Sequence, residues 1–103
     1  MIDLNEIQKQ IYQNKVNKGF NLTDICKEFC YIYGEVGEAY EAYNKNYDRK
    51  ELGMELADIA IYLLGLCEIL GFSLEDEVLK KMKINEKRIY IDGKKIEPKD
   101  AEE

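Results

Sequence analysis

Two pairs of acidic side chains stand at a spacing that suits the binding of a cation. Glu35 and Glu38 are three residues apart, and so are Glu55 and Asp58. In an α-helix, side chains at this spacing lie on one side, one above the other, and like charges there repel. Because a positive ion relieves this repulsion, the two pairs together indicate an acidic site that binds a cation.

Both pairs fall in stretches whose apolar residues recur at intervals of four and three, which predicts two amphipathic helices. The first is expected over Ile25 to Tyr43 and the second over Leu52 to Leu70. At ~100° per residue, each acid pair lies on the same side of its own apolar stripe. If the stripes face each other in an antiparallel pair, all four carboxylates converge at one edge of the packed seam. The stripes consist of Ile25, Phe29, Ile32, Val36, Ala39 and Tyr43, and of Leu52, Leu56, Ile59, Leu63, Leu66 and Leu70.

A solvated flank of two amphipathic helices is the alternative interpretation of these acids, because a chain with 21 acidic residues contains some pairs by chance. Two features favour a site. Neither pair has a basic residue four positions away that would neutralise it. Gly34 and Gly37 also stand inside the first of these helices, where each costs up to about 1 kcal/mol relative to alanine. Glycine there indicates the close approach of a ligand or of another backbone.

Any metal at this site would have oxygen ligands, because the chain has no histidine. Oxygen ligands favour Mg²⁺ or Mn²⁺ over zinc. Mg²⁺ held by a few carboxylates commonly keeps water ligands and serves a phosphate-containing substrate. Cys26 and Cys30 have a metal-ligand spacing, but without histidine or another nearby cysteine we interpret them, with Cys67, as reduced and buried thiols.

The composition is that of one small acidic domain. The chain has 103 residues, a net charge of −6 and a pI near 4.8. This charge argues against a nucleic-acid polymer as a partner, whereas a single nucleotide can be bridged to the acids by a metal. The longest apolar run, Ile59 to Cys67, is too short to span a membrane, and no signal peptide is recognised. The three cysteines, an odd number within helical segments, favour reduced thiols and therefore a cytoplasmic location. The small size favours oligomerisation.

Two further helices complete an all-α fold of four helices. They cover about residues 4–18 and 74–88, and capping-box patterns open both. Asp48 with Glu51 forms another capping-box pattern, which starts the third helix. Either Asn21 or Thr23 can cap the second helix. The third helix is apolar almost all round in its second half and is therefore expected to be the most buried element.

The C-terminal part predicts a short β-hairpin, because Asp92-Gly93 favours a type I′ turn between two brief apolar segments. We expect a single domain over residues 1–97, followed by a disordered acidic tail at 98–103. Among the other acids, Glu28 and Glu41 are predicted to lie at the surface.

The blocks that carry the acid pairs resemble a known family. The run Gly34-Glu35-Val36-Gly37-Glu38, followed by Glu55-Leu56-Ala57-Asp58, resembles the ExxE…ExxD signature of the all-α MazG-like nucleoside triphosphate pyrophosphohydrolases. The similarity extends from about Leu22 to Arg88 and includes the later block from Lys81 to Arg88. ExxE alone is not specific, but the three blocks in this order and spacing are.

The resemblance implies a helical bundle assembled as a homodimer or homotetramer. It also implies Mg²⁺-dependent cleavage of a nucleoside triphosphate to monophosphate and pyrophosphate, with nucleotide-pool cleansing as the expected role. Carried over residue by residue, the metal ligands would be Glu35, Glu38, Glu55 and Asp58, and Tyr62 would line the nucleoside pocket.

The family's triphosphate-binding region matches Lys81, Asn85 and Arg88, which share one face of the fourth helix. The alternative is that these residues complement the helix dipole and stay solvated. Gly34 stands where many members have another glutamate, as in the branch that resembles dCTP pyrophosphatases. A tryptophan that this branch uses near the base has no counterpart here, so cytosine preference does not follow.

The expected mechanism is metal-assisted hydrolysis, in which one carboxylate, Glu38, accepts the proton of the attacking water. Two other interpretations stay open: a non-catalytic helical oligomerisation or adaptor module, and a nucleotide-binding sensor without catalysis. A di-iron bundle is disfavoured, because the absence of histidine excludes its usual Glu-x-x-His motif.

Overall fold

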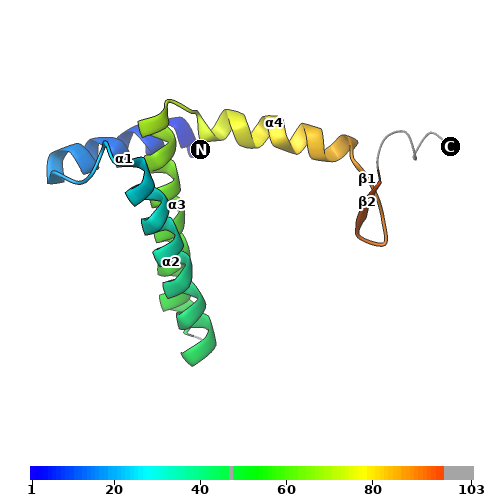
Figure 1. Ribbon diagram of the computed structural model, residues 1–103, viewed down its shortest axis with the longest axis horizontal. Coiled ribbons are helices and arrows are strands. Elements are labelled where there is room, and N and C mark those ends of the chain that lie inside the picture. The colour runs from blue at the N-terminus through cyan, green and yellow to red at the C-terminus, as the bar shows by residue number, and fades with distance from the viewer. Residues whose placement is uncertain (47, 97–103) are drawn as a thin grey trace.

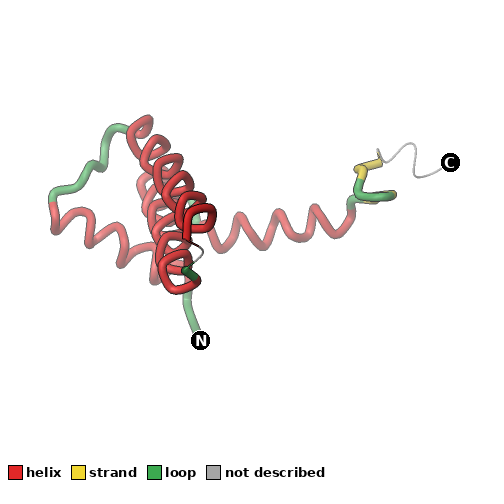
Figure 2. Tube along the Cα trace, turned by 90° about the horizontal axis from the view of Figure 1, so that it is seen from below, coloured by secondary structure: helices red, strands yellow, loops and turns green. Residues whose placement is uncertain are grey.

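The computed structural model describes residues 1–46 and 48–96, and it has the predicted all-α architecture with a short C-terminal hairpin. α2 and α3 lie side by side as a long antiparallel pair, α1 packs across one end of it, and α4 leaves this end as an arm (Figures 1 and 2). The predicted tail at 98–103 lies outside the described residues. The elements are α1 (Leu4–Lys18), α2 (Ile25–Asn46), α3 (Arg49–Leu70), α4 (Leu74–Lys87), β1 (Ile89–Ile91) and β2 (Lys94–Ile96).

Capping side chains decide where the helices begin. Asp3, Asp48 and Ser73 each accept hydrogen bonds from backbone N–H groups of the first turn, as their capping patterns predict. The cap of α2 differs from the prediction, because it is Asp24 that accepts an N–H three residues further on. Asn21 instead exchanges two hydrogen bonds with the backbone of Asp24, which fixes the loop between α1 and α2.

The buried core is small and centres on the second half of α3. Leu64, Leu66 and Cys67 are buried there, together with Ala39 of α2. α3 is therefore the most buried helix, as predicted from its apolar composition. The expectation of buried thiols is correct for Cys67 and wrong for the two cysteines of α2, which are exposed.

A buried amide on α1 fixes the corner between α3 and α4. Gln8 Nε2 donates to Glu68 Oε1 at 3.0 Å and to the carbonyl oxygen of Phe72 at 2.7 Å. Its Oε1 accepts the backbone N–H of Leu74 at 3.2 Å. α3 ends at Gly71, whose φ of 82° lies in the left-handed region. Gln8 thus bonds to the end of α3 and to the start of α4, and α4 leaves the corner at 101° to α3.

Within the described residues, no single helix is long and apolar enough to cross a membrane, and only the bent α3–α4 pair, taken together, passes by length and composition.

The hairpin at the end of the arm has the predicted turn. Asp92 and Gly93 adopt φ values of 51° and 78°, as a type I′ turn requires. The strands pair in antiparallel register, with Ile89 opposite Ile96. Most of the hairpin is exposed, so it does not dock on its own chain.

The apolar stripes of α2 and α3 face each other only in part, which corrects the prediction. One half of each stripe lies in the seam, whereas the other half is between 37% and 55% exposed. Each helix is rotated about its own axis so that the residues directly before the exposed apolar positions, including Glu35 and Glu55, face the seam. The exposed half consists of Phe29, Val36, Tyr43, Leu56, Leu63 and Leu70.

Candidate metal centre

Three carboxylates from two helices meet in the α2–α3 seam. Glu35 of α2 and Glu55 and Asp58 of α3 each offer one oxygen atom, and these three atoms lie within 4.8 Å of one another. A cation whose oxygen ligands are about 2.0–2.6 Å away holds them up to about 4–5 Å apart. The distances therefore suit one shared cation. Three of the four acids that the sequence singled out come together in this cluster.

Two oxygen atoms of the cluster have no hydrogen-bond partner among the described residues. Glu35 Oε2 and Glu55 Oε2 are both buried, although each residue as a whole is only half-buried. An unpaired buried carboxylate oxygen is strongly unfavourable. A cation would satisfy both atoms at once, so the donor set fits a hard metal ion.

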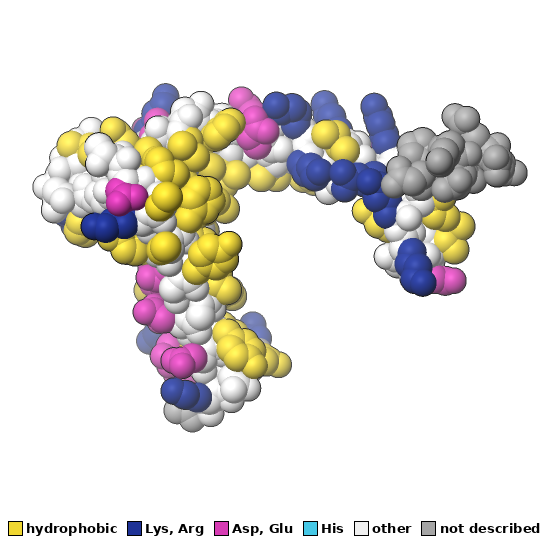
Figure 3. Space-filling view, viewed as in Figure 1, with side chains coloured by type: hydrophobic (Ala, Val, Ile, Leu, Met, Phe, Trp, Pro, Cys, Tyr) yellow, Lys and Arg dark blue, Asp and Glu magenta, His cyan; other side chains and the backbone are white. Residues whose placement is uncertain are grey.

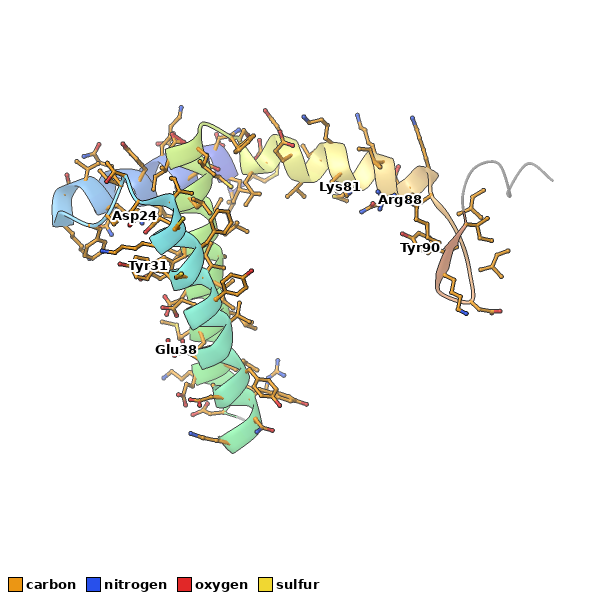
Figure 4. The ribbon with its side chains drawn as sticks, viewed as in Figure 1. Asp24, Tyr31, Glu38, Lys81, Arg88 and Tyr90 are labelled. Carbon is orange, nitrogen blue, oxygen red and sulfur yellow. The ribbon has the colours of Figure 1, made fainter. Side chains whose placement is uncertain are left out.

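The electrostatics of the cluster agree with this geometry and include the fourth acid. Burial raises the pKa of the Glu35 carboxyl, and interactions with Glu38, Asp58 and Glu55 raise it further. Burial also raises the pKa of Glu55, and Glu38 is again the strongest charged neighbour. Glu38 itself is exposed on α2 (Figure 4). Glu38 thus lies at the solvent side of the cluster, where its charge acts on the carboxylates of Glu35 and Glu55.

A cavity of about 390 Å³ opens beside Asp58. Tyr62, one turn after Asp58, forms part of its wall, together with Phe20 from the loop after α1. Gln10 and Asn14 of α1 add amide groups, Lys15 adds an ammonium group, and isoleucine side chains complete the lining. The acid cluster therefore adjoins a pocket that has aromatic, apolar and amide walls.

Tyr62 contacts a second aromatic ring. The ring centroids of Tyr62 and Tyr31 are 5.8 Å apart, with the rings tilted at 51°. Burial raises the pKa of the Tyr62 hydroxyl, and the charges of Glu35, Glu28 and Asp58 add to the effect. The Tyr62 hydroxyl therefore lies close enough to the cluster for the charges of Glu35 and Asp58 to act on it.

The predicted phosphate-binding residues lie elsewhere in the single chain. Lys81 and Asn85 belong to α4, and Arg88 follows that helix directly. Figure 4 shows Lys81 and Arg88 along the arm, well away from Glu38. One copy of the chain therefore does not bring these residues to the acid cluster.

The two glycines near the acids do not mark a close approach within the chain. A Cβ added at Gly34 or at Gly37 would meet no other atom within 4 Å. The predicted contact with another backbone is thus not found among the described residues.

Glu28 has a buried partner that was not predicted from the sequence. Glu28, predicted at the surface, is only 1% exposed and forms an ion pair with Lys15 of α1, which is 6% exposed. Glu41, also predicted at the surface, is exposed. The available signal was the register of Glu28, which stands two helical turns before Glu35 on the same face. Nothing local in α1 identifies Lys15 as its partner.

Comparison with known protein families gives one match. Residues 29–103 match the model of the MazG-like family, which covers most of the chain and both acid pairs. This family is generally associated with nucleotide pyrophosphohydrolase activity and is typically metal-dependent. The match does not distinguish the dCTP pyrophosphatase branch. Neither the curated proteins nor the solved structures gave a match.

Proposed function

We propose that this chain, which belongs to the MazG-like family, is an Mg²⁺-dependent nucleoside triphosphate pyrophosphohydrolase. Its products would be a nucleoside monophosphate and pyrophosphate. The observation that carries the proposal is the cluster of Glu35, Glu55 and Asp58, with its two unpaired buried oxygens, beside a pocket of nucleoside size.

The carboxylates of Glu35, Glu55 and Asp58 would hold the metal, and Mn²⁺ can substitute for Mg²⁺ at oxygen ligands of this kind. When bound, the metal supplies positive charge for the triphosphate and lowers the pKa of a water molecule. Glu38 reaches the cluster from the solvent side, where its carboxylate can accept a proton from the attacking water. This arrangement needs no covalent intermediate.

The pocket supports a nucleoside as the group next to the triphosphate. Tyr62 and Phe20 provide aromatic faces on which a planar base can stack, and the amides of Gln10 and Asn14 can bond with polar groups. Asp58 lines the same cavity. A base in this pocket therefore directs its phosphates toward the carboxylates.

A second copy of the chain is part of the proposal. The radius of gyration is 17.6 Å, whereas a compact chain of this length has about 13 Å. The exposed half of the α2 and α3 stripes leaves a large apolar surface for such a copy. Homodimers and homotetramers both fit these observations.

Charge also favours a second copy as the partner. Figure 3 shows Asp and Glu side chains on the α2–α3 pair and at the start of the α4 arm, and Lys and Arg side chains along the rest of the arm. An arm that packs on the α2–α3 pair of a neighbour would bring Lys81, Asn85 and Arg88 toward the neighbour's acids. The basic residues of the arm and hairpin are Lys80, Lys81, Lys83, Lys87, Arg88, Lys94 and Lys95.

A product assay tests the reaction. The purified protein is incubated with Mg²⁺ and each common ribo- and deoxyribonucleoside triphosphate, and the products are separated by ion exchange. We expect monophosphate and pyrophosphate from at least one substrate. Glu38→Gln and Asp58→Asn should abolish turnover and leave the helical circular dichroism unchanged. The exposed control Glu41→Gln should keep wild-type turnover. Wild-type turnover in Asp58→Asn would refute the metal assignment.

A mixing experiment tests whether sites are shared between copies. Arg88→Ala and Glu38→Gln are each prepared as inactive protein, then unfolded together and refolded as mixed oligomers. If the arm of one copy serves the acids of another, mixing should restore part of the activity. Mixed oligomers without activity would exclude shared sites.

A further inference from the structure

A buried ion pair stands beside the pocket and has no part in the hydrolysis proposed for the acid cluster. Lys15 Nζ donates to Glu28 Oε1, and Asn21 Nδ2 donates to Glu28 Oε2 at 3.2 Å. The ammonium group of Lys15 also lies 5.7 Å from the ring centroid of Tyr62. The pair thus joins α1, the loop after it and α2 at the wall of the pocket.

Packing alone does not require this pair. Removing two charges from water is so unfavourable that apolar residues of similar size commonly stabilise a fold as well or better. The structure nevertheless makes room for the lysine, because a Cβ at Gly65 of α3 would lie only 3.2 Å from Lys15 Cδ. Charged groups kept in such a place call for a role other than stability.

Lys15 lines two cavities that share a wall, and Glu28 lines one of them. Lys15, Phe20 and Tyr62 border the cavity beside Asp58, and they also border a second cavity of about 240 Å³. Glu28 and Asn21 line this second cavity as well. Tyr62 therefore borders two neighbouring cavities, one with Asp58 of the acid cluster in its wall and one with the ion pair in its wall.

We propose that Lys15 and Glu28 are specificity-determining residues that bind the polar edge of a nucleobase stacked on Tyr62. This inference rests on the proposed function, because it assumes that the pocket holds a nucleoside. The bond to Glu28 uses one of the three N–H donors of the Lys15 ammonium group. The Glu28 carboxylate can accept about four hydrogen bonds, and it accepts one from Lys15 and one from Asn21. Both groups therefore keep capacity for a ligand.

The chemistry of the pair favours one class of base. An ammonium donor binds best to a carbonyl oxygen, which carries more negative charge than an unprotonated ring nitrogen. A carboxylate binds best to a ring N–H beside a carbonyl, which is a stronger donor than an amino group. Uracil, thymine and guanine present this combination, and charge-assisted bonds to them are roughly twice as strong as neutral ones. Adenine and cytosine do not present it.

The test is calorimetric titration of the full chain with dUMP, dTMP, dGMP, dCMP and dAMP in EDTA, which removes any role of a metal or of turnover. We expect at least one of the first three to bind at least tenfold more tightly than dCMP and dAMP. In the double variant Lys15→Met/Glu28→Leu, affinity should fall at least tenfold and the preference should disappear. The exposed pair supplies the control, and Glu41→Gln/Lys45→Met should bind like wild type.

If the apolar double variant does not fold, Lys15→Gln/Glu28→Gln keeps hydrogen-bonding groups without charge and should show the same loss of preference. Binding within twofold of wild type in a folded double variant would overturn the inference. So would a wild-type preference for dCMP or dAMP, or no binding of any monophosphate. The last result leaves the proposed hydrolysis standing if triphosphates are cleaved, whereas base-selective binding without cleavage would overturn the hydrolysis alone.

Discussion

The Lys15–Glu28 pair gives a sharp prediction about stability that is separate from its role in binding. Its two side chains are 8% and 1% exposed, so each variant that removes one charge leaves the other buried without its partner. Breaking a buried pair in this way costs about 3–5 kcal/mol. We therefore expect Lys15→Met and Glu28→Leu each to lower the free energy of unfolding by about this amount.

The double variant should behave differently. Lys15→Met/Glu28→Leu removes both charges and fills the space with apolar atoms, so its stability should lie within about 1 kcal/mol of wild type or above it. For a domain of this size, 1 kcal/mol corresponds to about 4–8 °C in Tm. Each single variant should therefore melt at least about 12 °C below wild type, and the double variant should recover most of this loss.

Urea unfolding followed by circular dichroism, at one fixed protein concentration, measures these differences. The solvent-exposed pair Glu41–Lys45 is the control, and breaking it should change stability by less than about 0.5 kcal/mol. If the double variant lost as much free energy of unfolding as the two single variants together, the reasoning would be refuted, because the two charges would then not be coupled. So would a Lys15→Met protein as stable as wild type.

Three further predictions concern the acid cluster and the packing of α3. Because the pKa values of Glu35 and Glu55 are raised in the folded chain, their contribution to stability is present below the usual value near 4.5 and is lost as the pH rises through the raised values. When the pH is lowered from 7 to 5 without metal, the Tm of wild type should therefore rise relative to the Tm of Glu35→Gln/Glu55→Gln. Equal pH profiles of the two proteins would contradict this. Mg²⁺ should raise Tm at pH 7 in wild type, with nucleotide adding to the effect, and EDTA should reverse both shifts; a Tm that ignores Mg²⁺ would favour a non-catalytic module. Gly53→Ala, where an added Cβ meets nothing within 4 Å, should stabilise the exposed part of α3 by up to about 1 kcal/mol in urea unfolding. Gly65→Ala should show no such gain, since its Cβ would press on Lys15, and equal gains in the two variants would contradict the packing.

Much of the local structure could be read from short-range patterns. Asp48 caps α3 as its capping box predicts, and Asp92-Gly93 forms the expected turn. These features depend on hydrogen bonds within a few residues, so neighbouring sequence contains what is needed to predict them. The cap of α2 was the exception, because several side chains in that loop could serve and only the loop conformation selects Asp24.

The sequence by itself determined that the acid pairs share helix faces. Helical periodicity sets how side chains on one helix lie relative to each other, so spacing alone pairs Glu35 with Glu38, and Glu55 with Asp58. Only the tertiary structure decided how far each helix turns about its own axis. That rotation follows from the packing of three helices together, and it places Glu35 and Glu55 in the seam while leaving half of each apolar stripe exposed.

The same reason separates Glu28 from the other acids. Its place on α2 was readable, but its partner Lys15 comes from another helix, and the contact exists only because α1 crosses α3 at Gly65. The direction of α4 was equally unreadable, since it depends on the bonds that Gln8 makes at the α3–α4 corner. Periodicity within a helix is local, whereas the rotation, crossing and direction of helices are properties of the packed whole.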